Sequence, residues 1–93
     1  MIKGFRDTDA ERLWNEKRTR RIPASLRKRA LRKLQILNAA AALTDLLVPP
    51  GNRLESLQGD REGQHSIRIN DQYRVCFEWR DNNAYDLEIT DYH

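Results

Sequence analysis

The 93-residue chain contains a single cysteine, Cys76, and only two histidines, His65 and His93. One cysteine cannot form an internal disulfide, which excludes a disulfide framework and fits a reducing compartment such as the cytoplasm. Cys76 stands in the apolar run Val75–Phe77, so we expect a small buried side chain rather than a nucleophile. No Cys/His/Asp spacing resembles a zinc site. The sequence therefore predicts no metal and no cofactor.

Long hydrophobic runs are also missing. No stretch approaches the roughly 20 apolar residues that a membrane-spanning helix needs, and the first five residues are too short and polar for a signal peptide. The balance of 33% charged and 39% hydrophobic residues is typical of a soluble globular protein. We therefore expect a single cytoplasmic domain spanning residues 1–93, with no membrane partner.

Acidic residues are scarce in the first part of the chain. Residues 1–40 hold 12 Lys and Arg against 4 Asp and Glu, a balance of +8, whereas residues 41–93 hold 5 against 10, a balance of −5. The basic part can attract a polyanion, nucleic acid above all, or an acidic protein partner.

The pattern of the basic part predicts a short strand at Ile2–Arg6, a capped helix from Asp7–Asp9 to about Lys17, and a second helix beginning near Pro23. The second helix has an apolar stripe and a basic outer face. The stripe comprises Leu26, Ala30, Leu34, Leu37 and Ala41, and the outer face Lys28, Arg29, Arg32 and Lys33. That basic face is either a solvated surface or a face for phosphates or a partner. Residues 38–47 continue this helix or form a short further one.

After Val48–Asn52 the period changes from helical to two, which predicts strands. His65–Ile69, Tyr73–Trp79 and Ala84 to about Asp91 alternate apolar and polar side chains, and turn residues separate them. The expected fold is α+β: an N-terminal strand and two or three helices packed on one face of a mainly antiparallel sheet.

Two arginines, Arg68 and Arg74, project from the predicted strands away from the apolar face. On the free face of the sheet they would form a phosphate clamp, because guanidinium offers a planar fork of donors. The alternative is cross-strand pairing with Glu78, Asp86 or Glu88.

The chain ends in Tyr92-His93, directly after an alternating segment. A terminus tied into a sheet is ordered, so its imidazole and phenol could serve in proton transfer; otherwise the aromatic end is incidental. With the arginines, this supplies the parts for metal-free RNA cleavage, which needs a base for the 2′-hydroxyl, charge stabilisation at phosphate and an acid for the leaving oxygen.

Three linked motifs in one order add a resemblance that covers essentially the whole chain. These are Pro50–Arg61 (PGNRLESLQGDR), Gly63–Asn70 (GQHSIRIN) with Gln72–Phe77 (QYRVCF), and the closing Asp91-Tyr92-His93. They closely resemble the HigB-type toxins of the RelE superfamily, from bacterial type II toxin–antitoxin systems.

The resemblance implies a ribosome-dependent endoribonuclease that cuts mRNA and arrests translation. It implies a helix-turn-helix antitoxin of the HigA type as partner, with operator DNA bound only through the antitoxin. Arg74 matches the family's catalytic arginine, and Tyr92 and His93 match its C-terminal active pair. Gln58 departs from the pattern, since some members have a catalytic Lys there. Gln can hydrogen-bond phosphate without supplying charge, which leaves a larger role to Arg53, Arg61 or Arg68. We expect Lys28, Arg29 and Arg32 to contact RNA.

Two other functions remain open at this point. The chain could occupy a ribosome or an RNA without cutting it, or it could be a structural partner whose basic helix binds an acidic antitoxin. Mapping RNA cleavage with and without ribosomes separates the mRNA-cleaving toxin from both of these alternatives.

Overall fold

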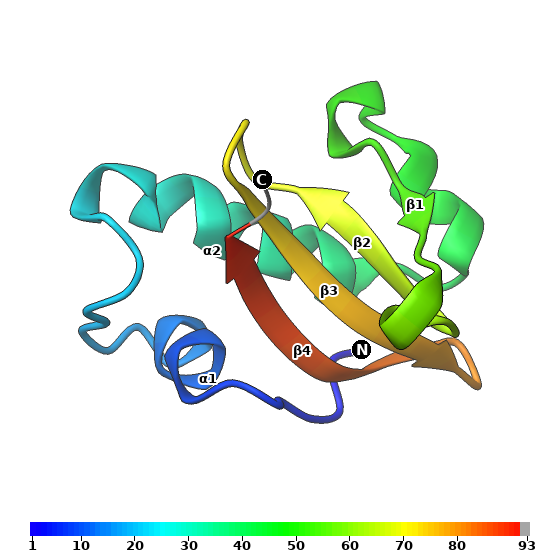
Figure 1. The fold of residues 1–93 in the computed structure, drawn as a ribbon, viewed down its shortest axis with the longest axis horizontal. Helices are drawn as coiled ribbons and strands as arrows, with labels where there is room; N and C mark the ends of the chain where they lie inside the picture. Colours follow the sequence, from blue (N-terminus) through cyan, green and yellow to red (C-terminus); the bar gives the residue numbers. More distant parts are fainter. Residues whose placement is uncertain (92–93) are drawn as a thin grey trace.

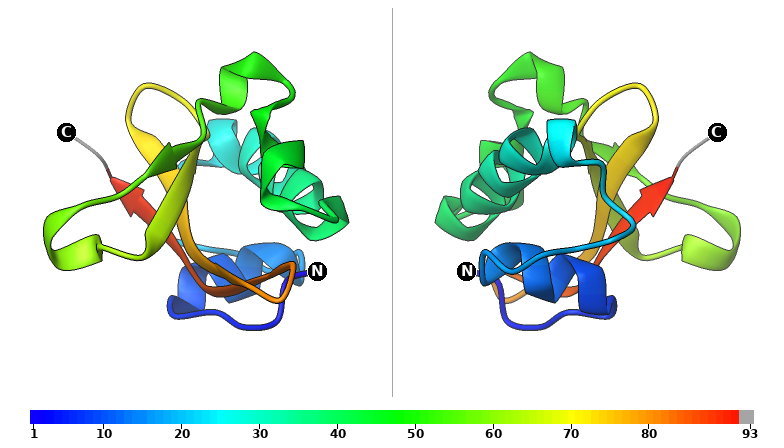
Figure 2. Two further views of the ribbon diagram at one scale, coloured as in Figure 1. Left: turned by 90° about the vertical axis from the view of Figure 1, so that its right-hand side faces the viewer. Right: turned by 90° about the vertical axis from the view of Figure 1, so that its left-hand side faces the viewer.

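A four-stranded antiparallel sheet covered on one face by two α-helices forms the computed structural model, which describes residues 1–91 (Figure 1). The strands follow one another in space in chain order: β1 (Glu55–Ser56), β2 (Gln64–Arg68), β3 (Tyr73–Arg80) and β4 (Asn83–Asp91). Figure 2 shows α2 on one side of the sheet and the 3₁₀ turn η3 (Gly59–Arg61) on the other. The predicted α+β class and antiparallel meander are confirmed.

The first helix, α1 (Thr8–Trp14), begins as the sequence predicts. Asp7 is its N-cap, and its Oδ1 accepts a hydrogen bond from the backbone N–H of Asp9 at 2.9 Å. The helix ends at Trp14 rather than at about Lys17, because Glu16 has a φ of +57°, a left-handed conformation that a right-handed helix cannot contain.

The segment before α1 forms a discontinuous version of the expected first strand. Ile2 and Phe5 make two isolated parallel bridges to β4, at Ala84 and Leu87. Asp86, between these two β4 positions, has a φ of +53°, so the edge of β4 is kinked and no continuous ladder forms.

The second helix, α2 (Ala24–Ala39), buries the predicted stripe of Ala30, Leu34 and Leu37. It stops two residues before Ala41, which is exposed, so the placement of Ala41 on the stripe was wrong. Lys33 also differs from the prediction. It is half-buried, and its Nζ donates a hydrogen bond to Asn52 Oδ1 at 2.5 Å instead of pointing into solvent.

The link between helix and sheet contains two 3₁₀ turns, η1 (Leu43–Leu47) and η2 (Pro50–Asn52), so the alternative of a further short helix was the right one. Burial does not alternate along β3 as the period of two predicts, because all five residues from Tyr73 to Phe77 are buried. Tyr73, Val75 and Phe77 face the helices and form the core with residues of β2 and β4 and with Ile69, which follows β2; Ile67 and Ile69 are buried as predicted. No helix in residues 1–91 is long and apolar enough to cross a membrane.

Candidate active site

Arg68 and Arg74 lie directly opposite each other on β2 and β3. Residues paired in this way point to the same face, and Val75, the neighbour of Arg74, lies in the core on the other face. The structure therefore places both guanidiniums on the face that the helices do not cover, as predicted. Two like charges directly opposite each other destabilise a sheet, so this pair favours a site for an anion.

Arg74 is a buried arginine, with only 8% of its surface exposed. Its Nε donates to Ser66 Oγ at 2.8 Å, and its Nη2 donates to the backbone carbonyl of Arg53 at 2.7 Å. Two fixed acceptors at different nitrogens fix both the position and the plane of the guanidinium.

Two carboxylates lie beside the arginines. Glu55 Oε1 is 3.7 Å from Arg74 Nη1, and Asp71 accepts a hydrogen bond from Arg68. Two of the three cross-strand alternatives pair elsewhere: Glu78 pairs with Arg80, and Glu88 pairs with arginines outside this pair. The two arginines and two carboxylates line a pocket of about 290 Å³, together with Arg53 and Asn70. The pocket is polar and mixed in charge, with three arginines against two carboxylates.

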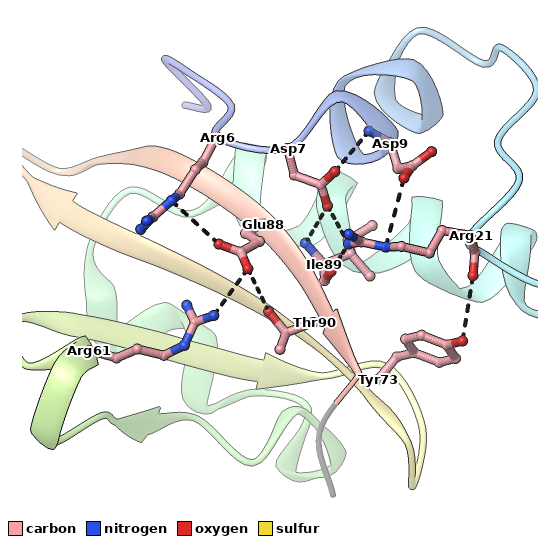
Figure 3. Close-up of polar contacts among 9 residues, drawn as sticks. All are labelled: Arg6, Asp7, Asp9, Arg21, Arg61, Tyr73, Glu88, Ile89 and Thr90. Carbon is pink, nitrogen blue, oxygen red and sulfur yellow. Dashed lines mark hydrogen bonds and ion pairs between the residues drawn. The ribbon is translucent and has the colours of Figure 1, made fainter.

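Glu88 on β4 binds arginines from two other segments (Figure 3). Its carboxylate is 3.0 Å from Arg61 Nη2 and 3.7 Å from Arg6 Nε. Arg61 also donates to Gln64 at 3.0 Å, and its hydrogen bond to Glu88 raises the pKa of the guanidinium above its ordinary value. The guanidinium of Arg61 thus binds Glu88 and Gln64, and it does not line the pocket of Arg74. Gln58, at the start of η3, is exposed.

A second polar cluster at the edge of β4 was missed by the sequence analysis. Asp7 Oδ2 accepts from the N–H of Ile89 at 3.2 Å and from Arg21 Nη2 at 2.6 Å, while Arg21 donates to the carbonyl of Ile89 (Figure 3). Two side chains therefore satisfy both backbone groups of an edge-strand residue. Asp7 was recognised only as a helix cap, because its long-range partners leave no local pattern.

The predicted terminal strand is confirmed as far as Asp91. Thr90 lies opposite Arg74, and Asp91 lies opposite Tyr73. The C-terminal end of β4 therefore lies in the same row of paired residues as Arg68 and Arg74. Tyr92 and His93 lie outside the described residues.

A family model matches almost the whole chain. Residues 3–93 match the model described as the RelE-like toxin of type II toxin–antitoxin system HigB. The chain belongs to this family.

Relatives of this HigB-family chain include Toxin HigB-1 of Vibrio cholerae serotype O1, 48% identical over 85 residues that cover 90% of each chain. Endoribonuclease HigB of Proteus vulgaris is 33% identical over 97 residues that cover all of both chains. Solved structures of similar fold include a YafQ mutant from E. coli, with a TM-score of 0.65, 11% identity and coverage of 98% of this chain and 93% of that one. The YoeB–YefM toxin–antitoxin complex from Staphylococcus aureus gives a TM-score of 0.62 at 16% identity, covering 100% and 98%.

The basic face of α2 in this HigB-family toxin lies in the helical layer, whereas the pocket of Arg74 lies on the open face of the sheet. Lys28, Arg29 and Arg32 are exposed, and none of them lines the pocket of Arg74. A hollow of about 800 Å³ lies at the basic joint before α2 and is lined by Asp9, Arg12, Arg18, Thr19, Arg20 and Arg21. The structure thus separates two basic surfaces from the arginine pair.

The remaining titratable candidates are built into the sheet. Cys76 is buried as predicted, and burial raises the pKa of its thiol. His65 lies 3.2 Å from Ser56 through its Nδ1, and burial lowers its pKa. Residues 1–91 contain no group of three or more His, Cys, Asp or Glu side chains that could hold a metal ion.

Proposed function

We propose that this HigB-family toxin is an endoribonuclease that cleaves mRNA on the ribosome and so inhibits translation. The observation that carries the proposal is Arg74, a buried guanidinium held beside Arg68 in a pocket on the open face of the sheet. A fixed cation that faces the site of a developing phosphate charge needs no reorganisation during the reaction. The Proteus vulgaris relative is named as an endoribonuclease, which supports the same reaction class here.

The proposed reaction is attack of the ribose 2′-oxygen on the adjacent phosphorus, with loss of the 5′-oxygen. Arg74 stabilises the added charge on phosphate, and Arg68 assists from the neighbouring strand. The 2′-hydroxyl loses its proton and the leaving 5′-oxygen gains one; His93 acts in this proton transfer, and Tyr92 positions the nucleotide or assists the transfer. No step of this route requires a metal ion. β4 ends beside the arginine row, and Tyr92 and His93 follow it directly in the sequence, which supports their assignment.

Three further residues are proposed to contact the RNA backbone to different degrees. Arg53 lines the pocket and is exposed, so its side chain can reach a phosphate. Gln58 is exposed and can offer a neutral hydrogen bond. Arg61 must exchange its bond to Glu88 for a phosphate, so we expect the smallest contribution from it.

The partners proposed for this chain are the ribosome, through Lys28, Arg29 and Arg32, and a helix-turn-helix antitoxin of the HigA type that neutralises the toxin in the cytoplasm. Operator DNA is contacted only through that antitoxin. The toxin–antitoxin family supports an antitoxin partner.

A non-cleaving ribosome- or RNA-binding module is the second candidate. Gln58 favours it, because a neutral side chain stands where some similar toxins carry a catalytic lysine. A third candidate, a structural partner for an acidic antitoxin, uses only the basic helix and leaves the arginine pocket without a role.

Cleavage mapping separates these functions. We expect the wild-type chain to cut a defined mRNA at discrete positions when ribosomes are present, and to leave the same mRNA intact without them. Binding to ribosomes without new RNA ends would establish the second candidate instead. Cutting of free RNA at the same rate would disprove ribosome dependence.

A further inference from the structure

Only three polar or charged residues of the described part, residues 1–91, are buried: Asn52, Ser66 and Arg74. They come from η2, β2 and β3: Ser66 binds Arg74 directly, and Asn52 precedes Arg53, whose carbonyl also binds Arg74. A buried polar group costs free energy unless it is hydrogen-bonded, so such groups seldom gather without a reason. Here the buried polar groups surround or support the guanidinium of Arg74.

Ser66 contacts Arg74 directly. It lies on β2 in the row next to Arg68, and its hydroxyl accepts from Arg74 Nε at 2.8 Å. The hydroxyl is completely buried, so water does not compete for this bond. Nε is the nitrogen nearest the aliphatic stem, so an acceptor there fixes the plane of the guanidinium.

Asn52 supports Arg74 indirectly, through the turn that contacts it. Its Nδ2 donates to the carbonyls of Leu46 and Val48, both at 3.2 Å, and its Oδ1 accepts from Lys33. These three bonds hold the turn that precedes Arg53.

Arg53 then presents its carbonyl to Arg74 Nη2 at 2.7 Å. Its backbone is left-handed, with φ 46° and ψ 57°, a conformation that costs a non-glycine residue free energy and persists only when its surroundings impose it. The left-handed Arg53 and the buried Asn52 before it therefore form one unit, whose carbonyl binds the guanidinium of Arg74.

We propose that Ser66 and Asn52 are positioning residues that hold the guanidinium of Arg74 in the orientation that phosphate requires. The inference rests on the proposed function, because it assigns these residues to the cleavage step. Ser66 fixes Nε, Asn52 fixes Nη2 through the Arg53 carbonyl, and the third nitrogen, Nη1, is directed toward Glu55 at the pocket. Neither Ser66 nor Asn52 touches the RNA.

A double-mutant cycle separates positioning from plain structural support. The variants are Ser66→Ala, Arg74→Ala and both together, in single-turnover mRNA cleavage on programmed ribosomes. Cys76→Ala is the matched control for Ser66→Ala, because Cys76 lies directly opposite Ser66 on the same face and is equally buried. Urea unfolding gives the folded fraction of each variant, and cosedimentation gives its affinity for ribosomes.

We expect Ser66→Ala to lower the cleavage rate at saturating ribosomes by about tenfold to a hundredfold, the scale of a small misplacement of a reacting group. Ribosome affinity and the Cys76→Ala rate should stay within about twofold of wild type. In the Arg74→Ala background, Ser66→Ala should change the residual rate by less than about twofold, since the group that it positions is gone.

Equal fold-losses in both backgrounds, or a wild-type rate in folded Ser66→Ala, would overturn the inference. If Ser66→Ala does not fold, Ser66→Cys serves instead, because it keeps the side-chain size and replaces the hydroxyl by a weaker acceptor. Full activity of Arg74→Ala itself would count against the proposed function rather than against the positioning.

Asn52→Asp tests the indirect branch in the same cycle. It keeps the shape of the side chain and the acceptor for Lys33 but removes both donors to the loop carbonyls. We expect a loss of cleavage that again disappears in the Arg74→Ala background. A loss that persists there would assign Asn52 to stability alone.

Discussion

Arg74 combines two properties that rarely occur together, full charge and near-complete burial. Burying a charge is costly unless it is paired and hydrogen-bonded, and the structure supplies Ser66, the Arg53 carbonyl and Glu55 for this purpose. Such an arrangement makes the group rigid rather than the fold stable. Rigidity is what an electrostatic catalyst requires, since its donors must already face the developing charge.

Replacing Gln58 with lysine should raise cleavage activity. A charge-assisted hydrogen bond to phosphate exceeds a neutral one by roughly 1–2 kcal/mol, so the gain should be about tenfold if the amine reaches the phosphate. The test is the single-turnover cleavage rate of Gln58→Lys, with Gln58→Met as a neutral control of similar length. Equal or lower cleavage by folded Gln58→Lys would show that this chain uses the position differently.

Deleting His93 alone should reduce cleavage by roughly two orders of magnitude or more, the usual scale for losing a general acid or base. A terminal residue contributes little to a core, so unfolding by urea and antitoxin binding should be nearly unchanged. If the shortened chain cuts at the wild-type rate, His93 is a bystander and Tyr92 becomes the first candidate for the proton carrier.

At the scale of the elements, the last part of β4 is bound from three segments of the chain. Arg6, Arg21 and Arg61 come from before α1, before α2 and from η3, and they bind Glu88 or Ile89 (Figure 3). An edge strand presents unpaired backbone groups, and the Asp7–Arg21 pair occupies those of Ile89. Together these contacts form a clamp of Arg6, Asp7, Arg21 and Arg61 on β4. The clamp holds the strand that leads to the proposed proton-transfer residues.

Asp7→Asn should destabilise the protein by about 1–3 kcal/mol. The amide keeps an oxygen for the helix cap but loses the charge that binds Arg21, whose bond to Asp7 is 2.6 Å long. Urea unfolding measures the change, and Asp9→Asn is the matched control, because Asp9 is 3.7 Å from Arg21 and more exposed. Equal stabilities of the two variants would show that the clamp contributes nothing through Asp7.

The basic face of α2 allows a separate prediction. Reversing Lys28 and Arg32 to glutamate should weaken ribosome binding and reduce the slope of log affinity against log salt by about one per lost phosphate contact. Reversal of Lys3 and Arg80, two exposed cations outside α2, controls for net charge. An unchanged salt slope in the α2 variant would remove this face from the docking surface.

Local pattern predicted most of these elements. The sequence located the helix start within Asp7–Asp9, the buried stripe of α2 and the core residues Tyr73, Val75 and Phe77, because hydrophobic period and capping are local properties. It misjudged the end of α1, since the left-handed Glu16 leaves no signature in composition. It missed the binding of Lys33 to Asn52 and of Arg21 to Ile89, because both depend on which elements the fold brings together.

The candidate site shows the same difference between features set by local pattern and contacts set by the fold. The period of two placed Arg68 and Arg74 on the open face, and the register confirms that they are direct neighbours. The alternative of cross-strand pairing named Glu78, Asp86 or Glu88, but the carboxylates beside the two arginines come from β1 and the β2–β3 turn, which no alternation pattern indicates. Ser66 was not singled out, since a serine on an alternating strand has no distinctive spacing.

On the scale of the whole molecule, the two sides of the sheet divide the proposed work. The helices cover one face (Figure 2), and α2 carries the exposed Lys28, Arg29 and Arg32 that would dock on the ribosome. The open face carries the arginine pocket and would cleave the mRNA. Docking and cleavage are therefore separable by mutation, with charge reversal on α2 affecting affinity and changes at Arg74 affecting the rate of the bound complex.

The central claim is that Arg74 stabilises phosphate charge during mRNA cleavage, and the rate of Arg74→Ala on programmed ribosomes tests it most directly. The account predicts a loss of about a hundredfold or more at saturating ribosomes, with secondary structure by circular dichroism and ribosome affinity both retained. Cleavage at the wild-type rate by folded, ribosome-bound Arg74→Ala would contradict it.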